Sequence, residues 1–381
     1  MPNAVICLSG WHPDLCRAEC LALIASSHVQ SVQSRRFCSV SDVDLHHLDS
    51  IIEVASGVQC VLIDGECMPW RGVDTPLLAL VETYLASHEM KGKVAVNAWR
   101  LDGKLEGFAT SEVAGKIGGL LSRAGYCIQL TNQDHTFAII ADASTSTVAF
   151  GWMTRPEIFK FGGHERRAGE RPFFKPVSLD PKLARAAVNL ACGPLHHGSL
   201  IDPMTGTGGF IIEAELSGRK GIGFDANSDM VHGAQRNLAW AQASNDSQTC
   251  LVLRGDATVM EASLPPTFIN QLFGFTLDPP YGRNSHGTVH AEGLIRQTLR
   301  SAHGIANEGA HFVIILPARP SDTLKPVQID LKADVSLLYS SWTEMLEMCA
   351  DEGWLPIDAY AERVHGSLSR VLLRLQFSPL S

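Results

Sequence analysis

The fold is decided by a glycine-rich turn, which reads Asp202-Pro203-Met204-Thr205-Gly206-Thr207-Gly208-Gly209. An apolar run at residues 199–201 predicts a strand before the turn, and the pattern over 209–216 predicts a helix after it. Glycines at such a junction let a ligand approach the backbone closely. The dinucleotide fingerprint would need a third glycine at position 211, where this chain has Ile211. The acidic Asp202 before the turn suits a cationic ligand better than a pyrophosphate.

Strand-like and helix-like segments alternate throughout the C-terminal half. Asp180 and Pro181 predict the start of a helix, which Gly193 ends. Strands are predicted at 199–201, 221–224, 251–253, 272–277 and 311–316, helices at 209–216, 228–243, 290–306 and 341–351, and a closing antiparallel pair at 356–361 and 370–377. These repeated units predict an α/β domain with a mostly parallel sheet and helices on both faces. Such a sheet binds its ligand at the carboxyl ends of the strands.

The N-terminal half has a different pattern, with short strand-like runs and helices of modest length. Strands are predicted at 4–8, 59–64, 93–100, 126–130 and 136–142, and helices at 15–25, 75–87 and 111–122, the last with Ser111 as its cap. This mixture predicts α+β layers rather than a doubly wound sheet. Three glycines and three prolines mark residues 155–176 as a linker. We therefore divide the chain into an N-terminal region (1–154), a basic linker (155–176) and a C-terminal domain (177–381).

Composition and charge limit the class of protein. The chain has 381 residues, and 45% of them are hydrophobic, which excludes a mainly disordered chain. No run approaches the roughly 18 apolar residues that cross a bilayer, and residues 1–11 lack a secretion signal, so we expect a cytoplasmic protein with no membrane contact. A net charge of −9 argues against wholesale nucleic-acid binding. Residues 155–185 nevertheless hold eight basic and four acidic side chains, which predicts a local basic patch.

The ten cysteines form no CxxC pair, and a chain of this size needs no disulfide staples. Reduced thiols are therefore expected. His12, Cys16 and Cys20 repeat at helical spacing and could line one face as metal ligands. Because no fourth ligand is evident, we favour a helix-starting turn with two buried thiols and expect no metal.

Two further aspartates end predicted strands. Asp225 is placed to accept both hydroxyls of a ribose. As a helix cap it would compete with Asn227 and Ser228, which favours the functional interpretation. Asp256 is either within reach of an adenine amino group or an ordinary turn aspartate after Gly255.

The most specific motif follows the apolar strand at 272–277 and reads Asp278-Pro279-Pro280-Tyr281-Gly282. The double proline ends the strand and stiffens the loop. The carboxylate and nearby carbonyls remain as acceptors, with an aromatic ring beside them. This pattern indicates a planar substrate with an exocyclic amine, whose protons the acceptors take while Tyr281 stacks on the ring.

Together these pieces resemble the motif series of S-adenosylmethionine-dependent amino-methyltransferases of the Rossmann-like class. More narrowly, the chain resembles the THUMP-domain tRNA guanine-N2 methyltransferases of archaeal type, which modify guanosine 10. The matching pieces are Arg171-Pro172-Phe173-Phe174-Lys175-Pro176, residues 181–185, 278–283 and 363–370, and, for a strand turn of the THUMP domain, residues 130–134. The resemblance is close over 165–381 and loose over 1–155.

The resemblance implies a ferredoxin-like and THUMP RNA-binding half before a Rossmann-like methyltransferase domain. It also implies S-adenosyl-L-methionine as cofactor, tRNA as substrate and a monomer, with an accessory subunit left open. The catalytic residues would be Asp278, Pro279, Pro280 and Tyr281, with Tyr281 holding a base rotated out of its helix. The cofactor residues would be Asp202, Pro203, Thr205, Gly206, Gly208, Asp225, Asp256, Ala257 and Phe174. The RNA-binding residues would be Arg166, Arg167, Arg171, Lys175 and Arg283.

Several alternatives stay open at this point. The target could be another tRNA guanosine or ribosomal RNA, with one methyl group added or two. The chain could also be an RNA-binding protein with a decayed cofactor site, although Asp202, Asp225 and Asp278 are all intact. Carbon-5 methylation is disfavoured because no cysteine follows a proline, and neither a Walker A sequence nor HExxH occurs. The first 165 residues hold twelve Lys and Arg against eighteen Asp and Glu, so RNA docking there must depend on shape and a few placed cations.

Overall fold

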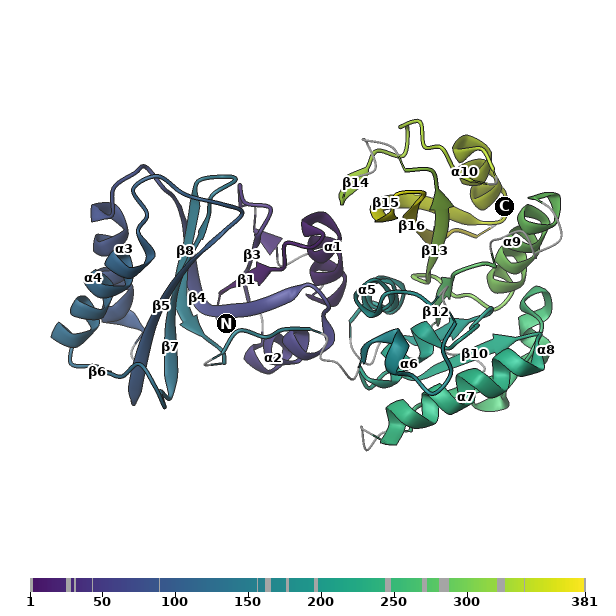
Figure 1. The fold of residues 1–381 in the computed structure, drawn as a ribbon, viewed down its shortest axis with the longest axis horizontal. Coiled ribbons are helices and arrows are strands. Elements are labelled where there is room, and N and C mark those ends of the chain that lie inside the picture. The colour runs from purple at the N-terminus through teal and green to yellow at the C-terminus, as the bar shows by residue number, and fades with distance from the viewer. Residues whose placement is uncertain are drawn as a thin grey trace. The chain divides into compact units, whose positions relative to one another are not determined.

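The chain forms two compact units, Met1–Lys160 and Phe161–Ser381, in the computed structural model (Figure 1). The boundary between the units falls inside the segment predicted as a linker. The structure describes residues 3–24, 29–30, 32–42, 44–88, 90–155, 157–161, 166–175, 178–194, 198–243, 248–268, 273–280, 288–320, 326–338 and 340–379.

The first unit is built on one eight-stranded sheet with the strand order β2-β3-β1-β4-β8-β7-β5-β6. Its elements are β1 (Ala4–Leu8), α1 (Pro13–Ile24), β2 (Val29–Gln30), β3 (Phe37–Val40), α2 (Leu45–Val54), β4 (Val58–Pro69), α3 (Thr75–Ser87), β5 (Lys93–Leu101), α4 (Thr110–Arg123), β6 (Cys127–Ile128), β7 (His135–Asp142) and β8 (Thr147–Met153). In β1 to β4 the chain order is βαββαβ, and β1 lies between β3 and β4 with antiparallel pairing on both sides. This is the ferredoxin-like topology, as expected.

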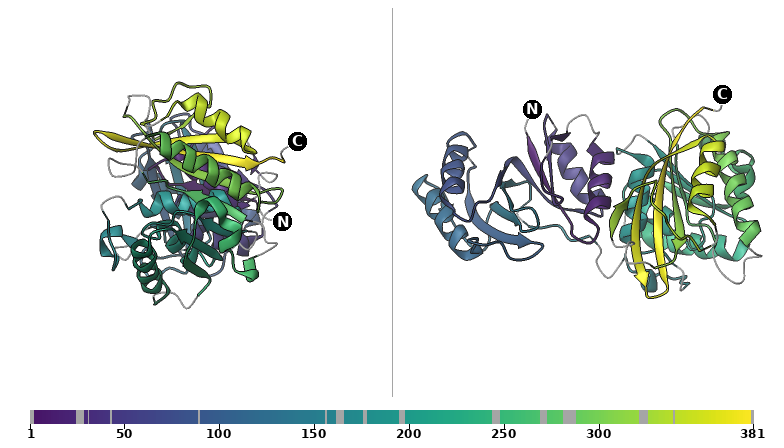
Figure 2. Two further views of the ribbon diagram at one scale, coloured as in Figure 1. Left: turned by 90° about the vertical axis from the view of Figure 1, so that its right-hand side faces the viewer. Right: turned by 90° about the horizontal axis from the view of Figure 1, so that it is seen from above.

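The second part of this unit continues the same sheet. β4 pairs with β8, β8 with β7, and β7 runs parallel to β5. Helices α3 and α4 lie together on one side of these strands (Figures 1 and 2). They bury a core of aromatic rings that includes Tyr84, Phe137, Phe150 and Trp152. The α+β layers are confirmed, and the assignment of this part to a THUMP domain stays a prediction.

Some local predictions for this unit were wrong. Helix α4 begins at Thr110, and its cap position is Ala109 rather than Ser111, with no side-chain cap. The sequence patterns also missed β3, α2 and β8. β8 is buried at every position, so it lacks the polar–apolar alternation that identifies a half-exposed strand.

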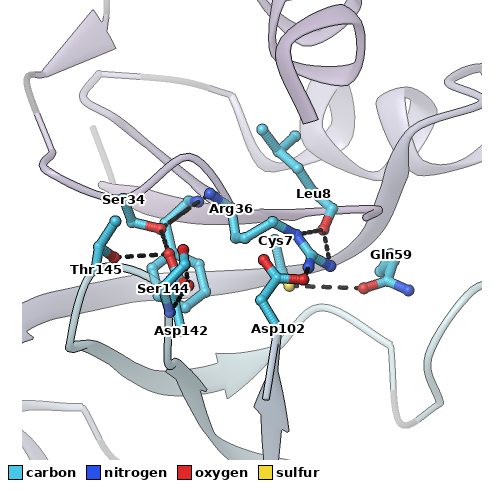
Figure 3. A network of polar contacts seen from close by, with 10 residues as sticks. Cys7, Leu8, Ser34, Arg36, Gln59, Asp102, Asp142, Ser144 and Thr145 are labelled. Atoms are coloured by element: carbon cyan, nitrogen blue, oxygen red, sulfur yellow. Dashed lines mark hydrogen bonds and ion pairs between the residues drawn. The ribbon is translucent and has the colours of Figure 1, made fainter. Parts of the chain in front are cut away.

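A buried polar network joins the two parts of the first unit (Figure 3). Asp142 accepts hydrogen bonds from Ser34 Oγ at 2.7 Å, Ser144 Oγ at 2.6 Å and Thr145 Oγ1 at 2.7 Å. Arg36, which is 3% exposed, donates to the Leu8 carbonyl and pairs with Asp102. Because Ser34 and Arg36 precede β3 while the carboxylates lie at the ends of β7 and β5, the network fixes one part against the other.

The second unit is an α/β domain with the strand order β11-β10-β9-β12-β13-β16-β15-β14. Its elements are α5 (Pro181–Cys192), β9 (Ser199–Asp202), α6 (Gly209–Glu215), β10 (Gly221–Asp225), α7 (Ser228–Ala243), β11 (Cys250–Arg254), α8 (Met260–Ser263), β12 (Phe273–Leu277), α9 (Thr288–His303), β13 (His311–Ala318), β14 (Val327–Ile329), α10 (Trp342–Asp351), β15 (Trp354–His365) and β16 (Leu368–Phe377). The five strands from β11 to β13 are parallel, and β16 pairs antiparallel with both β13 and β15. The predicted α/β class and the closing antiparallel pair are confirmed.

Helices cover both faces of this sheet. Successive residues of each strand point to opposite faces, so each face contributes its own side chains to the packing. On one face Phe275, Phe312 and Ile314 pack with residues of α8, α9 and α10. On the other face glycines bring α5 and α6 close to the strands. A Cβ at Gly274 would lie 2.4 Å from the carbonyl oxygen of Ala191 in α5, and one at Gly223 would lie 2.9 Å from Ile211 in α6. Among the described residues, no helix is long and apolar enough to cross a membrane.

Candidate active site

Four aspartates lie along one edge of the parallel sheet, on four neighbouring strands. The register pairs Gly223 with Asp202, so Asp225 lies two residues beyond it, and Arg254 with Asp225, so Asp256 lies two residues further again. On the other side of β9, Phe275 pairs with Ile201, which places Asp278 just beyond Asp202 along β12. The strand order reverses between β9 and β12, and ligands of open α/β sheets bind in the crevice at such a switch point.

The glycine-rich turn is held against β10 by backbone contacts. The Thr205 N–H donates to the Phe224 carbonyl at 2.7 Å, and the Gly206 N–H donates to Asp225 Oδ2 at 3.0 Å. Gly206 and Gly208 have φ values of +51° and +85°, in the left-handed region that favours glycine. No atom outside the turn lies close to a Cβ built at Gly206, where the nearest is the Met204 carbonyl oxygen at 4.0 Å. The turn therefore leaves its backbone open to a ligand at Gly206.

Asp202 is the most perturbed carboxyl group of the site. It is 1% exposed, and neither carboxylate oxygen has a hydrogen bond of ordinary geometry. Burial raises its pKa to about 8. The neighbouring Thr205 hydroxyl and Met204 N–H oppose that rise, and the charges of Asp225 and Asp278 add to it. A buried carboxyl group with free acceptors next to two more carboxylates is suited to a cation and disfavours a phosphate.

Asp225 and Asp256 both have structural contacts. Asp225 Oδ1 accepts from the Asn227 N–H at 2.9 Å, and Asn227 in turn caps α7 through the Asp229 N–H at 2.8 Å. Asn227 thus caps the helix, and the predicted binding of ribose hydroxyls by Asp225 stays a prediction. Asp256 accepts from the Thr258 N–H and hydroxyl, both at 2.8 Å, so it caps the short helical turn that contains the buried Ala257. Each carboxylate retains acceptor capacity for a ligand.

Asp278 follows β12 directly and is partly buried. Burial raises its pKa to about 6, although the positive charge of Arg370 on β16 opposes the rise. Pro279 is buried and Pro280 is exposed, so the loop leaves the sheet at this point. Tyr281 and Arg283 lie outside the described residues, and their predicted roles stay predictions.

The segment 171–175 is fastened to the glycine-rich turn by Asn237 of α7, a residue that no motif identified. Asn237 Oδ1 accepts from the Phe173 N–H, and its Nδ2 donates to the carbonyls of Phe173 and Thr207, each at 2.8 Å. Ser178 Oγ also lies 3.3 Å from Thr207 Oγ1. Phe173 packs on Gly233, whereas Phe174 is 49% exposed with its side chain free to meet a ligand. Pro203 is buried beneath the turn.

Of the predicted RNA-binding arginines, Arg166 is partly buried and Arg171 is buried. Arg166 Nη1 pairs with the buried Glu213 at 2.9 Å and its guanidinium stacks on Phe161. Arg171 is 4% exposed. The predicted basic surface patch therefore does not include Arg171, because its side chain is buried, and RNA binding by the other predicted residues stays a prediction. Arg167 is exposed, and Lys175 is half-buried with its ammonium over the Phe173 ring.

The N-terminal histidine and cysteines form the helix-starting turn that we favoured. His12 Nδ1 accepts from the Leu15 N–H at 3.2 Å, and Cys16 and Cys20 are fully buried on α1. Within the described ranges, no group of three His, Cys, Asp or Glu side chains could hold a metal ion.

A separate groove of about 650 Å³ lies within the first unit. It is lined by β5 residues such as Asn97 and Trp99, by the start of α4, and by Gln133, Glu157 and Lys160. One acidic and one basic side chain balance each other there. The groove therefore offers amide and aromatic groups rather than net positive charge.

Comparisons with known proteins place this geometry in a family. Residues 168–323 match a family model described as RMKL-like, methyltransferase domain. The tRNA (guanine(10)-N2)-dimethyltransferase of Pyrococcus abyssi is 28% identical over 257 residues, which cover 67% of this chain and 65% of that protein. A relative from Methanothermococcus thermolithotrophicus, named "Probable tRNA (guanine(10)-N2)-dimethyltransferase", is 31% identical over 134 residues, 35% of this chain and 77% of its own length. The chain belongs to the tRNA (guanine(10)-N2)-dimethyltransferase family.

The matches differ in how much of each protein they cover. The chain spans about half of the length of the Methanothermobacter thermautotrophicus member, which is 32% identical over 210 residues, 55% of this chain and 52% of that protein. A solved structure, TrmN from Thermus thermophilus, aligns with 98% of this chain and 99% of its own at 16% identity, with a TM-score of 0.47. All four aspartates of the strand edge lie within the matched methyltransferase domain.

Proposed function

We propose that this member of the tRNA (guanine(10)-N2)-dimethyltransferase family transfers methyl groups from S-adenosyl-L-methionine to the exocyclic N2 amine of a guanosine in tRNA. The target is position 10, and the product is N2-methylguanosine, with the dimethyl form as the end product if a second transfer follows. The observation that carries the proposal is Asp278-Pro279-Pro280 at the end of β12, beside the glycine-rich turn at the end of β9.

The residues at the strand edge fit the cofactor. Its sulfonium is a cation, and the orphaned carboxylate of Asp202 suits a cation. Asp225 retains acceptor capacity for ribose hydroxyls and Asp256 for an adenine amine, while Gly206 leaves space beside its backbone. When bound, S-adenosylmethionine supplies an electrophilic methyl group, so the protein's main task is alignment.

The residues after β12 supply the remaining chemistry. The N2 amine of guanine is a poor nucleophile, because its lone pair is delocalised into the ring. Acceptance of its two protons by the Asp278 carboxylate and the Pro279 carbonyl would localise that lone pair. Asp278, with a pKa of about 6, is ionised at neutral pH and able to take the proton that the amine loses. Tyr281 would stack on the rotated base.

The N-terminal unit would dock the tRNA through shape and a few cations. Its groove at β5 and α4 is one candidate contact, and the exposed Arg167 of the second unit is another. The acidic balance of the first 165 residues predicts a weak salt dependence of tRNA binding compared with a strongly basic RNA-binding domain. We place the protein in the cytoplasm as a monomer.

The decisive experiment is methyl transfer from radiolabelled S-adenosylmethionine to an unmodified tRNA transcript, followed by nucleoside mass spectrometry. The wild type should give N2-methylguanosine, and a transcript with adenosine at position 10 should give none. Asp278→Ala should reduce the rate by about 100-fold or more, because it removes both an acceptor and a base. Asp351→Ala, on an exposed helix end, is the matched control and should leave the rate unchanged.

Two other outcomes would redirect the proposal. Methyl incorporation into the transcript with adenosine at position 10 would mean that the target is a different guanosine. No incorporation despite measurable binding of the cofactor would sink the tRNA assignment and point to ribosomal RNA or to a missing partner subunit.

A further inference from the structure

Two guanidinium groups pair with a single buried carboxylate in the second unit, and its negative charge also acts on a third. Glu213 of α6 is fully buried, and its Oε2 accepts from Arg166 Nη1 at 2.9 Å and from Arg185 Nε at 3.0 Å. The negative charges of Glu213 and of Asp180, at the start of α5, also act on Arg171. Arg171 nevertheless forms no ion pair with either of them, in the part of the chain that the structure describes. The two arginines that pair with Glu213 both do so through Oε2, and its Oε1 has no hydrogen-bond partner among the described residues.

Arg171 is the unsatisfied member of this cluster. It is 4% exposed, and its Nε, Nη1 and Nη2 all lack a hydrogen-bond partner. Burial lowers the pKa of its guanidinium, although no ordinary shift neutralises an arginine at neutral pH. A buried cation whose donors have no partner strongly destabilises the folded protein. Such a side chain is retained at this cost where a bound anion pairs with it.

The position of Arg171 indicates where that anion binds. The segment that carries it is fastened to the glycine-rich turn through the Phe173–Asn237–Thr207 contacts. Its Nη1 lies 3.9 Å from a Cβ built at Gly209, the residue that follows the turn. The unpartnered guanidinium nitrogens of Arg171 therefore lie beside the glycine-rich turn, whose first residue is Asp202.

We propose that Arg171 receives the carboxylate of the cofactor's amino-acid end. This inference rests on the proposed function, since it assumes that S-adenosylmethionine is the ligand of the turn. The planar fork of a guanidinium matches a carboxylate with two parallel hydrogen bonds. A phosphate of the RNA backbone is a poorer candidate, because a side chain that is 4% exposed is out of reach of a bulky polyanion. The carboxylate is also the single anionic group that the cofactor carries.

The test compares two ligands that differ in this end alone. S-adenosylhomocysteine carries the amino-acid end, whereas 5′-methylthioadenosine keeps the adenosine and the thioether without it. Both ligands are titrated into wild type and Arg171→Gln by calorimetry. The affinity of Arg171→Gln for S-adenosylhomocysteine should be about 30-fold or more below that of wild type. The affinity for 5′-methylthioadenosine should stay within about 3-fold. Arg123→Gln, at the exposed end of α4 in the first unit, is the control and should change neither.

A second variant and a second ligand keep the test decisive. Arg171→Lys keeps the positive charge but lacks the planar fork of the guanidinium, so the affinity for S-adenosylhomocysteine alone should fall about 5- to 10-fold. This variant decides the question if Arg171→Gln fails to fold. Equal losses for both ligands would mean a structural role and overturn the inference. Unchanged binding of both with weakened tRNA binding would assign the anion to RNA and overturn it too. Failure of wild type to bind either ligand would instead refute the proposed cofactor, and the inference with it.

Discussion

Asn237 of α7 holds both backbone polar groups of Phe173, accepting from its N–H and donating to its carbonyl, each at 2.8 Å. The same Nδ2 reaches the Thr207 carbonyl in the glycine-rich turn. Asn237 is fully buried, so no water replaces it readily. One side chain thus sets the distance between the 171–175 segment and the turn, and every ligand contact proposed for either depends on it.

We predict that Asn237→Ala destabilises the second unit by about 3 kcal/mol, because it leaves one buried donor and two acceptors without partners. The affinity for S-adenosylhomocysteine should fall as well, since the segment and the turn would no longer be fixed together. Differential scanning calorimetry and titration of the ligand measure the two effects. His232→Ala, exposed on the same helix, should change neither. Unchanged stability of Asn237→Ala would show that the hydrogen bonds of Asn237 to Phe173 and Thr207 are dispensable.

Gly274 on β12 gives a prediction about the closeness of helix α5 to the sheet. A Cβ there would lie 2.4 Å from the Ala191 carbonyl oxygen, a backbone atom that cannot turn aside. Gly274→Ala should therefore shift α5 and cost about 3 kcal/mol or more, at the upper end of overpacking effects. Gly293→Ala on α9 meets no atom within 4 Å and should stabilise by about 0.5 to 1 kcal/mol. Urea unfolding followed by tryptophan fluorescence compares them, and equal midpoints for the two variants would contradict the packing argument.

Asp142 gives the first unit a predicted acid sensitivity. Burial alone would raise its pKa, but hydrogen bonds from Ser144, Ser34 and Thr145 outweigh it and hold the pKa below the ordinary value of 3.8. A lowered folded-state pKa stabilises the protein above pH 3.8, and that stabilisation is lost as the pH falls toward the folded value.

Asp142→Asn should therefore destabilise the first unit at pH 7 by about 1 to 3 kcal/mol and weaken the dependence of its stability on pH below 4. Hydrogen exchange of peptides from β7 and β8, at pH 7 and pH 3, reports on this unit alone. Glu82→Gln on the exposed face of α3 serves as the matched charge removal. An identical acid response in Asp142→Asn and wild type would show that other carboxylates cause it.

The sequence predicted the strand edge well because each aspartate follows a run whose period is unambiguous. Asp202 and Asp225 end buried strands and Asp278 follows one directly, and parallel strands bring their carboxyl ends to one edge. The helix from Asp180 to Gly193 was equally clear, since Asp180 caps it through the Lys182 N–H at 2.8 Å. Local patterns therefore predicted which aspartates share one edge of the sheet.

The tertiary contacts of the site could not be predicted from the sequence. Asn237 is one of several polar residues on α7, and nothing in its neighbours shows that it is the one facing the 171–175 segment. The sequence predicted Arg166 and Arg171 in a surface patch because Glu213, the buried partner of Arg166, is more than forty residues away in the chain. Charge counting along a segment cannot distinguish a surface patch from a buried cluster, since it lacks the position of the opposing carboxylate.

Asp278 gives the prediction that bears most directly on catalysis. Burial raises its pKa to about 6, and the positive charge of Arg370 limits that rise. A protonated Asp278 is a weaker hydrogen-bond acceptor for the amine and cannot take the proton that the amine loses. The methyl-transfer rate under single-turnover conditions should therefore rise with pH, with a midpoint near 6. Arg370→Gln removes the opposing charge and should move this midpoint upward.

Two neighbouring groups must be separated from Asp278 in that profile. Burial, together with Asp180, raises the pKa of Glu362 to about 7 against the charge of Arg370, and the pKa of Asp202 is about 8. Glu362 lies opposite Arg370 on β15, so Glu362→Gln tests it directly and should leave the midpoint near 6. Arg363→Gln, on the exposed part of the same strand, should also leave the midpoint in place. A midpoint that vanishes in Glu362→Gln, or that stays fixed in Arg370→Gln, would transfer the essential ionisation away from Asp278.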